Sequence, residues 1–280
     1  MNNNTQEARK VLTIPTSKVE GLIGKFSGFC PKDLVADPHE EFYKIWNTMF
    51  ENECSFSDKE KAEKDLSLKQ VIPYFILINK GDVMAYSRGT ESEERLHGTM
   101  SIGVGGHIES YDGLVSSEAY FTGAQRELIE EASLMVQFGD INNAFVGFIN
   151  DESTEVSQVH LGLAHIIVIN DNERDALEKK GCALGKVDFI PIDEIQNEIE
   201  NFEKWSQHAI KMISRTEEAS KEKQAFLTEL TRIASTIIYP ASCRLASKSM
   251  PINHVLDMEI RSQIKDLGKL VEYAKKEKVL

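Results

Sequence analysis

The chain has 280 residues, of which 41% are hydrophobic and 28% are charged. This composition is typical of a folded globular protein and argues against disorder over most of the chain. Lys and Arg number 32 against 45 Asp and Glu, so the formal net charge is −13, which disfavours broad nucleic-acid binding because phosphate backbones are gripped mainly by basic side chains.

Neither a membrane span nor a secretory leader is expected from the sequence. The longest apolar runs, such as 75–78 and 166–169, are far shorter than the roughly 20 residues that a spanning helix needs. The start of the chain lacks a basic segment followed by an apolar one, which a secretory signal requires. The cysteines are scattered and form no C-x-x-C pair, so we expect reduced thiols in a cytoplasmic protein.

Residues 1–69 are predicted to form an N-terminal extension packed on the main domain. Residues 11–15 have the composition of a strand, and the charged run 58–65 is expected to be a solvated helix or loop. Between them a helix is predicted, because apolar residues recur at helical spacing. These residues are Phe42, Ile45, Trp46 and Met49.

Residues 70–215 are predicted to form the main domain. Two strands at 71–78 and 83–87 are joined by a turn that contains glycine, which is an ordinary hairpin signal. The pattern is helical from 193 onward. Further strand-like runs lie between these parts, at 100–104, 144–149, 160–169 and 187–190.

A helical appendage is predicted over residues 216–280. Its apolar residues form two narrow stripes at helical spacing, so we expect the helices to need a further surface. That surface is either the main domain or a second subunit of a homodimer. The stripes are Phe226, Leu230, Ile233 and Ile237, and then Ile260, Ile264, Leu267 and Val271.

The segment most informative about chemistry is Arg126-Glu127-Leu128-Ile129-Glu130-Glu131. On a helix, Glu127, Glu130 and Glu131 stand at i, i+3 and i+4, which puts like charges on one face. A hard divalent cation among the carboxylates offsets their repulsion, and Mg²⁺ takes oxygen ligands together with substrate phosphates. The alternative interpretation is an ordinary solvated face of a Glu-rich helix.

The same helix is predicted to begin near Thr122, because the segment 122–125 has the form of a capping box. Its opposite face carries Ala124, Leu128 and Ala132, which are expected to pack on a sheet. We therefore expect one helix to present carboxylates on one side and small apolar residues on the other.

The strand-like run at 100–104 leads into Gly105-Gly106, and glycines at a strand end allow close approach to a ligand. Together with Glu118 and the segment 126–131, this assembly resembles the signature of the Nudix (MutT-type) hydrolases, G-x5-E-x7-R-E-U-x-E-E-x-G-U, where U is a bulky aliphatic residue. The sequence departs from that pattern at two glycines, which are replaced by Asp112 and Ser133. The loop before the helix is accordingly expected to be about six residues longer than usual.

More of the chain is similar to one subgroup of this family, the MutT-like proteins described as predicted phosphoesterases. The similarity spans about residues 11–215, and the chain after 216 shows none. The segments that carry it include 69–74, 94–98, 101–108, 147–151 and 160–163.

The resemblance implies an α+β fold, with a mixed curved sheet between helices, and cleavage by water of a nucleoside diphosphate linked to another group. It also implies Mg²⁺ or Mn²⁺ as cofactor. The implied catalytic residues are Glu127, Glu130 and Arg126, with one carboxylate as general base and the arginine orienting the carboxylates. The implied metal ligands are Glu127, Glu130, Glu131 and the backbone of Gly105.

Substrate-binding candidates are Gly106, His107, Arg88 and Arg95. Each arginine flanks an acidic loop, so it either holds a phosphate by a forked contact or pairs with a neighbouring glutamate. His160 and His165 lie within a strand and are expected to be structural, as are the strand aromatics Tyr74, Phe75 and Tyr86. A further carboxylate ligand from a later loop stays open among Asp151, Glu152, Glu155 and Glu173.

Two other functions remain possible at this point. One is a Nudix-like module that senses a nucleotide without cutting it, although the intact Glu127, Glu130 and Glu131 argue against this. The other is an interaction protein in which the C-terminal helices matter most. The sequence does not name the diphosphate substrate.

Overall fold

The computed structural model describes residues 8–32, 40–87, 99–136, 141, 144–180 and 185–215. The chain divides into two compact units, Met1–Met212 and Ile213–Leu280. The predicted helical appendage at 216–280, with its proposed role in a homodimer, lies outside the described residues. Within the described part of the chain, no helix is both long and apolar enough to cross a membrane.

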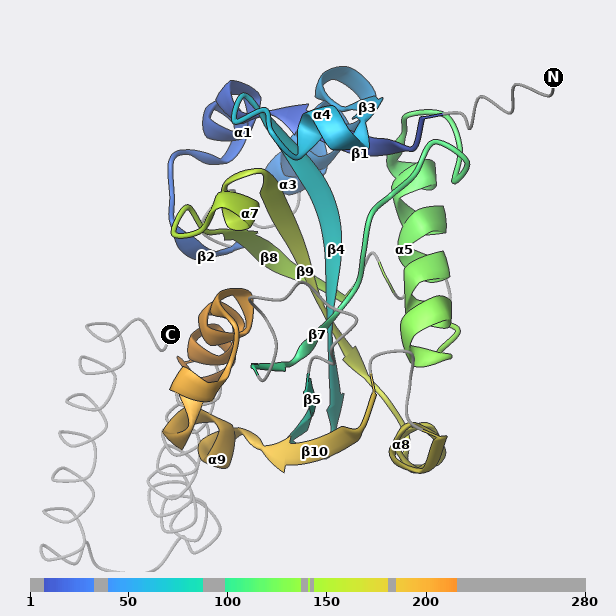
Figure 1. Ribbon diagram of the computed structural model, residues 1–280, viewed down its shortest axis with the longest axis vertical. Coiled ribbons are helices and arrows are strands. Elements are labelled where there is room, and N and C mark those ends of the chain that lie inside the picture. Colours follow the sequence, from blue (N-terminus) through green and yellow to red (C-terminus); the bar gives the residue numbers. More distant parts are fainter. Residues whose placement is uncertain are drawn as a thin grey trace, which may run out of the picture. The chain divides into compact units, whose positions relative to one another are not determined.

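One sheet runs through the first unit, with the strand order β10-β5-β4-β9-β8-β2 along its main path (Figure 1). The central strands β4 and β9 are parallel, whereas the other neighbours on this path are antiparallel. The sheet is therefore mixed, as expected. Its strands are β2 (Gly28–Pro31), β4 (Leu68–Asn79), β5 (Asp82–Ser87), β8 (Phe145–Asn150), β9 (His160–Val168) and β10 (Val187–Pro191).

The N-terminal segment contributes strands to the same sheet. Strand β1 (Lys10–Pro15) pairs antiparallel with β3 (Ser55–Asp58) and with the beginning of β4. The charged run after β3 contains the short helix α4 (Lys59–Ala62), capped by the carboxylate of Asp58. The strand predicted at 11–15 is thus present, and it joins the sheet directly.

Helices α1 (Thr16–Ile23), α3 (Glu40–Thr48) and α5 (Ser117–Ala132) contribute to one hydrophobic core with the sheet. Trp46 of α3 is the aromatic centre of this core. Its ring centroid lies 5.4 Å from that of Tyr120 and 5.7 Å from that of Phe121, both on α5, and 5.3 Å from that of Phe145 on β8. A π-helical turn, Met49–Glu53, continues α3.

The opposite face of the sheet is covered by a helical segment at 204–212 (Figure 1). Neighbouring residues of β4 show the two faces: Phe75 packs toward the core, while the hydroxyl of Tyr74 bonds to Ser206 at 2.9 Å. The fold is therefore α+β, with a curved mixed sheet between helices, as expected. The remaining elements are β6 (Met100–Ser101), β7 (Gly103–Val104), α7 (Glu155–Gln158), α8 (Asp171–Lys180), α9 (Ile192–Asn197) and the 3₁₀ turn Ile199–Asn201.

Helix α5 begins at Ser117, so the predicted start near Thr122 was wrong. Ser116 is the N-cap: its backbone is extended and its hydroxyl accepts the N–H of Ala119 at 3.2 Å. Thr122 has the residue types of a cap but lies inside the helix, because the chain has already turned at Ser116. The apolar face is as predicted, since Ala124, Leu128 and Ala132 are all buried.

Ser133 ends α5 in the left-handed conformation, with φ 54° and ψ 27°, and its N–H donates to the carbonyl of Ile129 at 2.9 Å. This conformation is costly for a residue with a Cβ atom. We predict that Ser133→Gly raises the free energy of unfolding by about 0.5–1 kcal/mol, as measured by urea denaturation. Thr122→Gly, inside the same helix, should lower it; equal effects of the two glycines would contradict the prediction.

Candidate active site

The carboxylate helix and the glycine pair meet directly. The N–H of Gly105 donates to Oε2 of Glu131 at 3.1 Å. A Cβ atom on Gly106 would lie 2.3 Å from Oε2 of Glu127, and one on Gly105 would lie 1.8 Å from the carbonyl oxygen of Pro73. Both contacts are closer than any real Cβ atom allows. Glycine is therefore required at Gly105, where the clash is with the backbone of β4, whereas a side chain at Gly106 would displace the carboxylate of Glu127.

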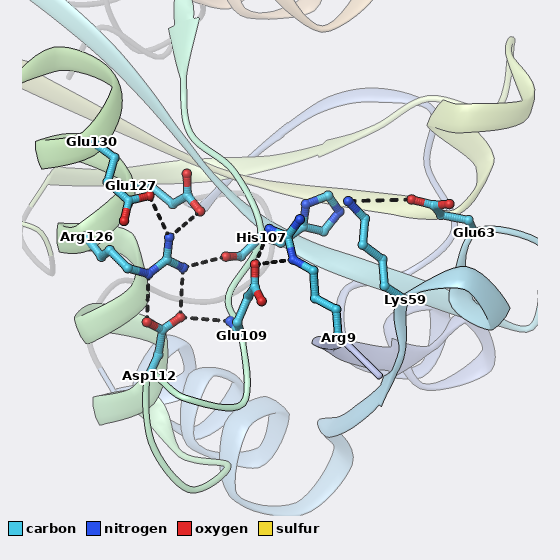
Figure 2. Close-up of polar contacts among 9 residues, drawn as sticks. All are labelled: Arg9, Lys59, Glu63, His107, Glu109, Asp112, Arg126, Glu127 and Glu130. Carbon is cyan, nitrogen blue, oxygen red and sulfur yellow. Dashed lines mark hydrogen bonds and ion pairs between the residues drawn. The ribbon is translucent and has the colours of Figure 1, made fainter. Parts of the chain in front are cut away.

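Arg126 joins the two parts of the site (Figure 2). Its Nε and Nη2 donate to the two carboxylate oxygens of Asp112 at 2.8 and 2.9 Å. Nη1 donates to Glu127 at 2.7 Å and to Glu130 at 3.1 Å, and Nη2 donates to the carbonyl of His107 at 2.8 Å. The hydrogen bond to Asp112 is the largest cause that raises the pKa of Arg126, so the guanidinium stays charged.

Asp112 is a site residue that the sequence alone did not identify. Its carboxylate is buried and also accepts the N–H of Glu109 at 2.7 Å. Glu118, the acidic residue of the resemblance, is instead exposed in the first turn of α5, where a negative charge suits the helix dipole. In the sequence, Gly123 was the available signal that another group lies close to this helix, because glycine inside a helix often marks a close approach. A Cβ atom on Gly123 would lie 2.5 Å from Oδ2 of Asp112.

The three glutamates have different environments. Glu127 is 7% exposed, whereas the side chain of Glu130 is 58% exposed and Glu131 is half-buried. Burial raises the pKa of Glu127, and the bond from Arg126 opposes this shift. Across the described ranges, no three His, Cys, Asp or Glu side chains gather closely enough to hold a metal ion. Arg126 bonds to Glu127 and Glu130, and the N–H of Gly105 bonds to Glu131.

The N-terminal strand holds the glycine loop from the other side. The N–H of Leu12 donates to the carbonyl of Ile108 at 2.8 Å, and that of Ser110 donates to the carbonyl of Lys10 at 3.1 Å. The guanidinium of Arg9 bonds to the buried carboxylate of Glu109. The loop is thus fixed by β1 as well as by α5.

His107 presents its two ends to different surroundings. Its carbonyl accepts from Arg126, while its ring lies 5.6 Å from the ring of His160, between centroids (Figure 2 shows the carbonyl side). Burial, followed by the nearby charge of Lys59, lowers the pKa of His107 to about 3. The imidazole is therefore uncharged at neutral pH and does not act as a cation.

The other candidates are dispersed. Arg88 and Arg95 lie outside the described residues. Among the later carboxylates, Asp151 is buried and accepts from Ser153 in the turn after β8, Glu173 accepts the N–H of Asn170 at the start of α8, and Glu152 and Glu155 are exposed. Tyr74, Phe75, Tyr86 and His165 are buried, which agrees with the structural roles expected for them.

Comparison with known proteins gives two informative similarities. No protein-family profile matches the chain. Protein YmaB of Bacillus subtilis (strain 168) is 29% identical over 184 residues, which cover 62% of this chain and 86% of YmaB. The crystal structure of Tm1382, "a putative Nudix hydrolase", superposes with a TM-score of 0.56 and 25% identity over 73% of this chain and 97% of Tm1382. The fold of the first unit is thus of the Nudix type.

The carboxylate of Asp112 should contribute to stability, because it is buried and holds two donors of Arg126. We predict that Asp112→Asn lowers the free energy of unfolding by about 2–3 kcal/mol, since it removes the charge of a buried pair. Glu118→Gln should change it by less than about 0.5 kcal/mol, because Glu118 is exposed. Chemical denaturation of both variants measures this, and similar losses would refute the assignment.

Proposed function

We propose that this protein is a Nudix-type hydrolase that cleaves, with water, a phosphoanhydride bond in a nucleoside diphosphate linked to another group. The observation that carries the proposal is the contact of Glu127 and Glu131 with the glycine pair, beside which Arg126 bonds both to Glu127 and to the carbonyl of His107. The structural similarity to Tm1382 supports the same class. We also propose that the protein belongs to the predicted-phosphoesterase subgroup and that it is cytoplasmic.

The cofactor proposed is Mg²⁺ or Mn²⁺. Its ligands would be the carboxylates of Glu127, Glu130 and Glu131 with the backbone of Gly105. These are hard oxygen donors of the type that either ion prefers, and the carboxylates would have to move closer together than they lie here to bind it. The exposure of Glu130 fits this role, because among the described residues its carboxylate bonds only to Arg126 on the same helix and is otherwise open to solvent. When bound, the ion neutralises charge on the phosphate oxygens and lowers the pKa of the attacking water.

The side chains of the site then have separate tasks. Arg126 orients Glu127 and Glu130, and it offsets the repulsion between these carboxylates and Asp112. Gly106 lets the carboxylate of Glu127 lie directly against the backbone of the loop. Glu130 reaches solvent and is the carboxylate best placed to take a proton from water as general base.

A second candidate is a Nudix-like module that binds a nucleotide without cutting it. One observation favours it: in the described structure, Arg126 and the Gly105 N–H already bond to the carboxylates that would ligate a metal. Turnover separates the two candidates, since a binding module would retain affinity for nucleotides and release no product.

We predict that the purified protein hydrolyses at least one nucleoside diphosphate derivative with Mg²⁺ or Mn²⁺ and that EDTA abolishes this. Glu131→Gln should lower kcat by orders of magnitude while the fold is retained, because it removes a metal-binding charge without adding bulk. Phosphate products released from a panel of such compounds are the measurement. Glu118→Gln is the matched control and should keep wild-type turnover; an active Glu131→Gln would exclude the metal assignment.

A further inference from the structure

A row of rings extends from the glycine loop along the face of the sheet opposite α5. The ring centroid of His107 lies 5.6 Å from that of His160, which lies 6.5 Å from that of Trp205, which in turn lies 5.7 Å from that of Tyr74. Tyr74 is buried, while the other three residues are partly exposed. We call His107, His160 and Trp205 the ring row.

Trp205 packs against the sheet in this row. A Cβ atom on Gly162 of β9 would lie 2.8 Å from Cζ3 of Trp205, so the indole rests on bare backbone. The backbone N–H of Trp205 donates to Glu203 at 2.9 Å, and the neighbouring Ser206 bonds to the hydroxyl of Tyr74 at 2.9 Å. A pre-ordered aromatic surface of this kind loses little conformational entropy when a planar ligand stacks on it.

Gln70 lies beside the ring row and is the main anomaly in the described core. It is the register partner of His160 in the parallel pair of β4 and β9, so the two side chains project from the same face of the sheet. It is 1% exposed, and neither its amide nitrogen nor its amide oxygen has a hydrogen-bond partner among the described residues. Native proteins rarely leave a whole buried amide unsatisfied, because doing so costs stability.

The histidines of the row add further polar groups. Nδ1 of His160 lies 2.7 Å from the carbonyl of Val156, and a carbonyl can only accept, so Nδ1 of His160 carries a proton. Nε2 of His107 is buried without a partner in the described part of the chain. The cations near His107 are already paired, Arg9 with Glu109 and Lys59 with Glu63. The surroundings therefore suit an uncharged planar group better than a phosphate.

We propose that the ring row and Gln70 bind the base of the nucleotide substrate, with Trp205 as the stacking surface and the Gln70 amide reading the edge of the base. This inference rests on the proposed function and specifies the substrate as a nucleotide recognised through its base. A side-chain amide pairs with a base edge through one donor and one acceptor, which are the two groups that Gln70 leaves unsatisfied. The same loop serves both parts of the substrate, because the carbonyl of His107 faces Arg126 and its ring faces the row.

Direct binding tests this without any need for hydrolysis. Isothermal titration calorimetry of the full chain in EDTA, with AMP, GMP, CMP and UMP, should show saturable binding of at least one nucleotide. Ribose 5-phosphate, which lacks a base, should bind at least tenfold more weakly, and Trp205→Ala should remove this preference. Equal affinity for ribose 5-phosphate, or no binding of any nucleotide, would overturn the proposal. Absence of turnover in wild type would instead count against the hydrolase.

A stability measurement separates recognition from a structural role for Gln70. Gln70→Met should raise the melting temperature, because it replaces an unsatisfied buried amide with an apolar group of similar size, and it should weaken nucleotide binding at least tenfold. Gln207→Met is the matched control: this buried amide donates to the carbonyl of Phe202 at 2.7 Å, so its loss should lower the melting temperature. A lower melting temperature for Gln70→Met, or unchanged affinity, would overturn the assignment.

Discussion

The guanidinium of Arg126 is the interaction on which the site depends. Asp112 and Glu127 are both buried, and two carboxylates that close to each other are tolerated only if a cation lies between them. Arg126 supplies that charge. Its planar guanidinium binds Asp112 of the loop and Glu127 of the helix at the same time. Lysine, as a single point charge, would not bridge these partners in the same geometry.

This constraint explains the glycines around it. Arg126 can reach the carbonyl of His107 only if the loop lies against α5, and the loop lies there because Gly106 and Gly123 have no side chain to hold it off. Pairing of β1 with residues 108–110 presses the same loop from the opposite side. A loop fixed from two sides is pre-organised, which is what catalysis by positioned charges requires.

The two sides of the loop differ in chemistry. Toward α5 lie ionised groups around Arg126, and toward His160 lie aromatic rings and an unsatisfied amide. A nucleotide has the same division between a charged phosphate part and an uncharged base. The proposed function and the proposed base site therefore describe one substrate lying across one loop.

Several parts of this protein were predictable from sequence because they depend on backbone periodicity alone. The 3.6-residue repeat of a helix places Glu127, Glu130 and Glu131 on neighbouring positions and turns Ala124, Leu128 and Ala132 to the core, whatever surrounds them. The strands of the sheet were likewise predictable from their apolar runs, and the hairpin of β4 and β5 from the glycine in its turn. The start of α5 was misjudged, because Ser116 and Thr122 have similar capping chemistry and only the path of the chain chooses between them.

Tertiary structure decided everything that depends on residues far apart in the chain. Asp112 meets Arg126 across 14 positions and Arg9 meets Glu109 across 100, and no local pattern specifies such pairs. Burial separates Glu127 from Glu130 although both belong to one motif, because the helix turns one toward the glycine loop and the other toward solvent. The sequence by itself determined which chemical groups the site has, whereas packing decided which of them are buried, paired or left unsatisfied.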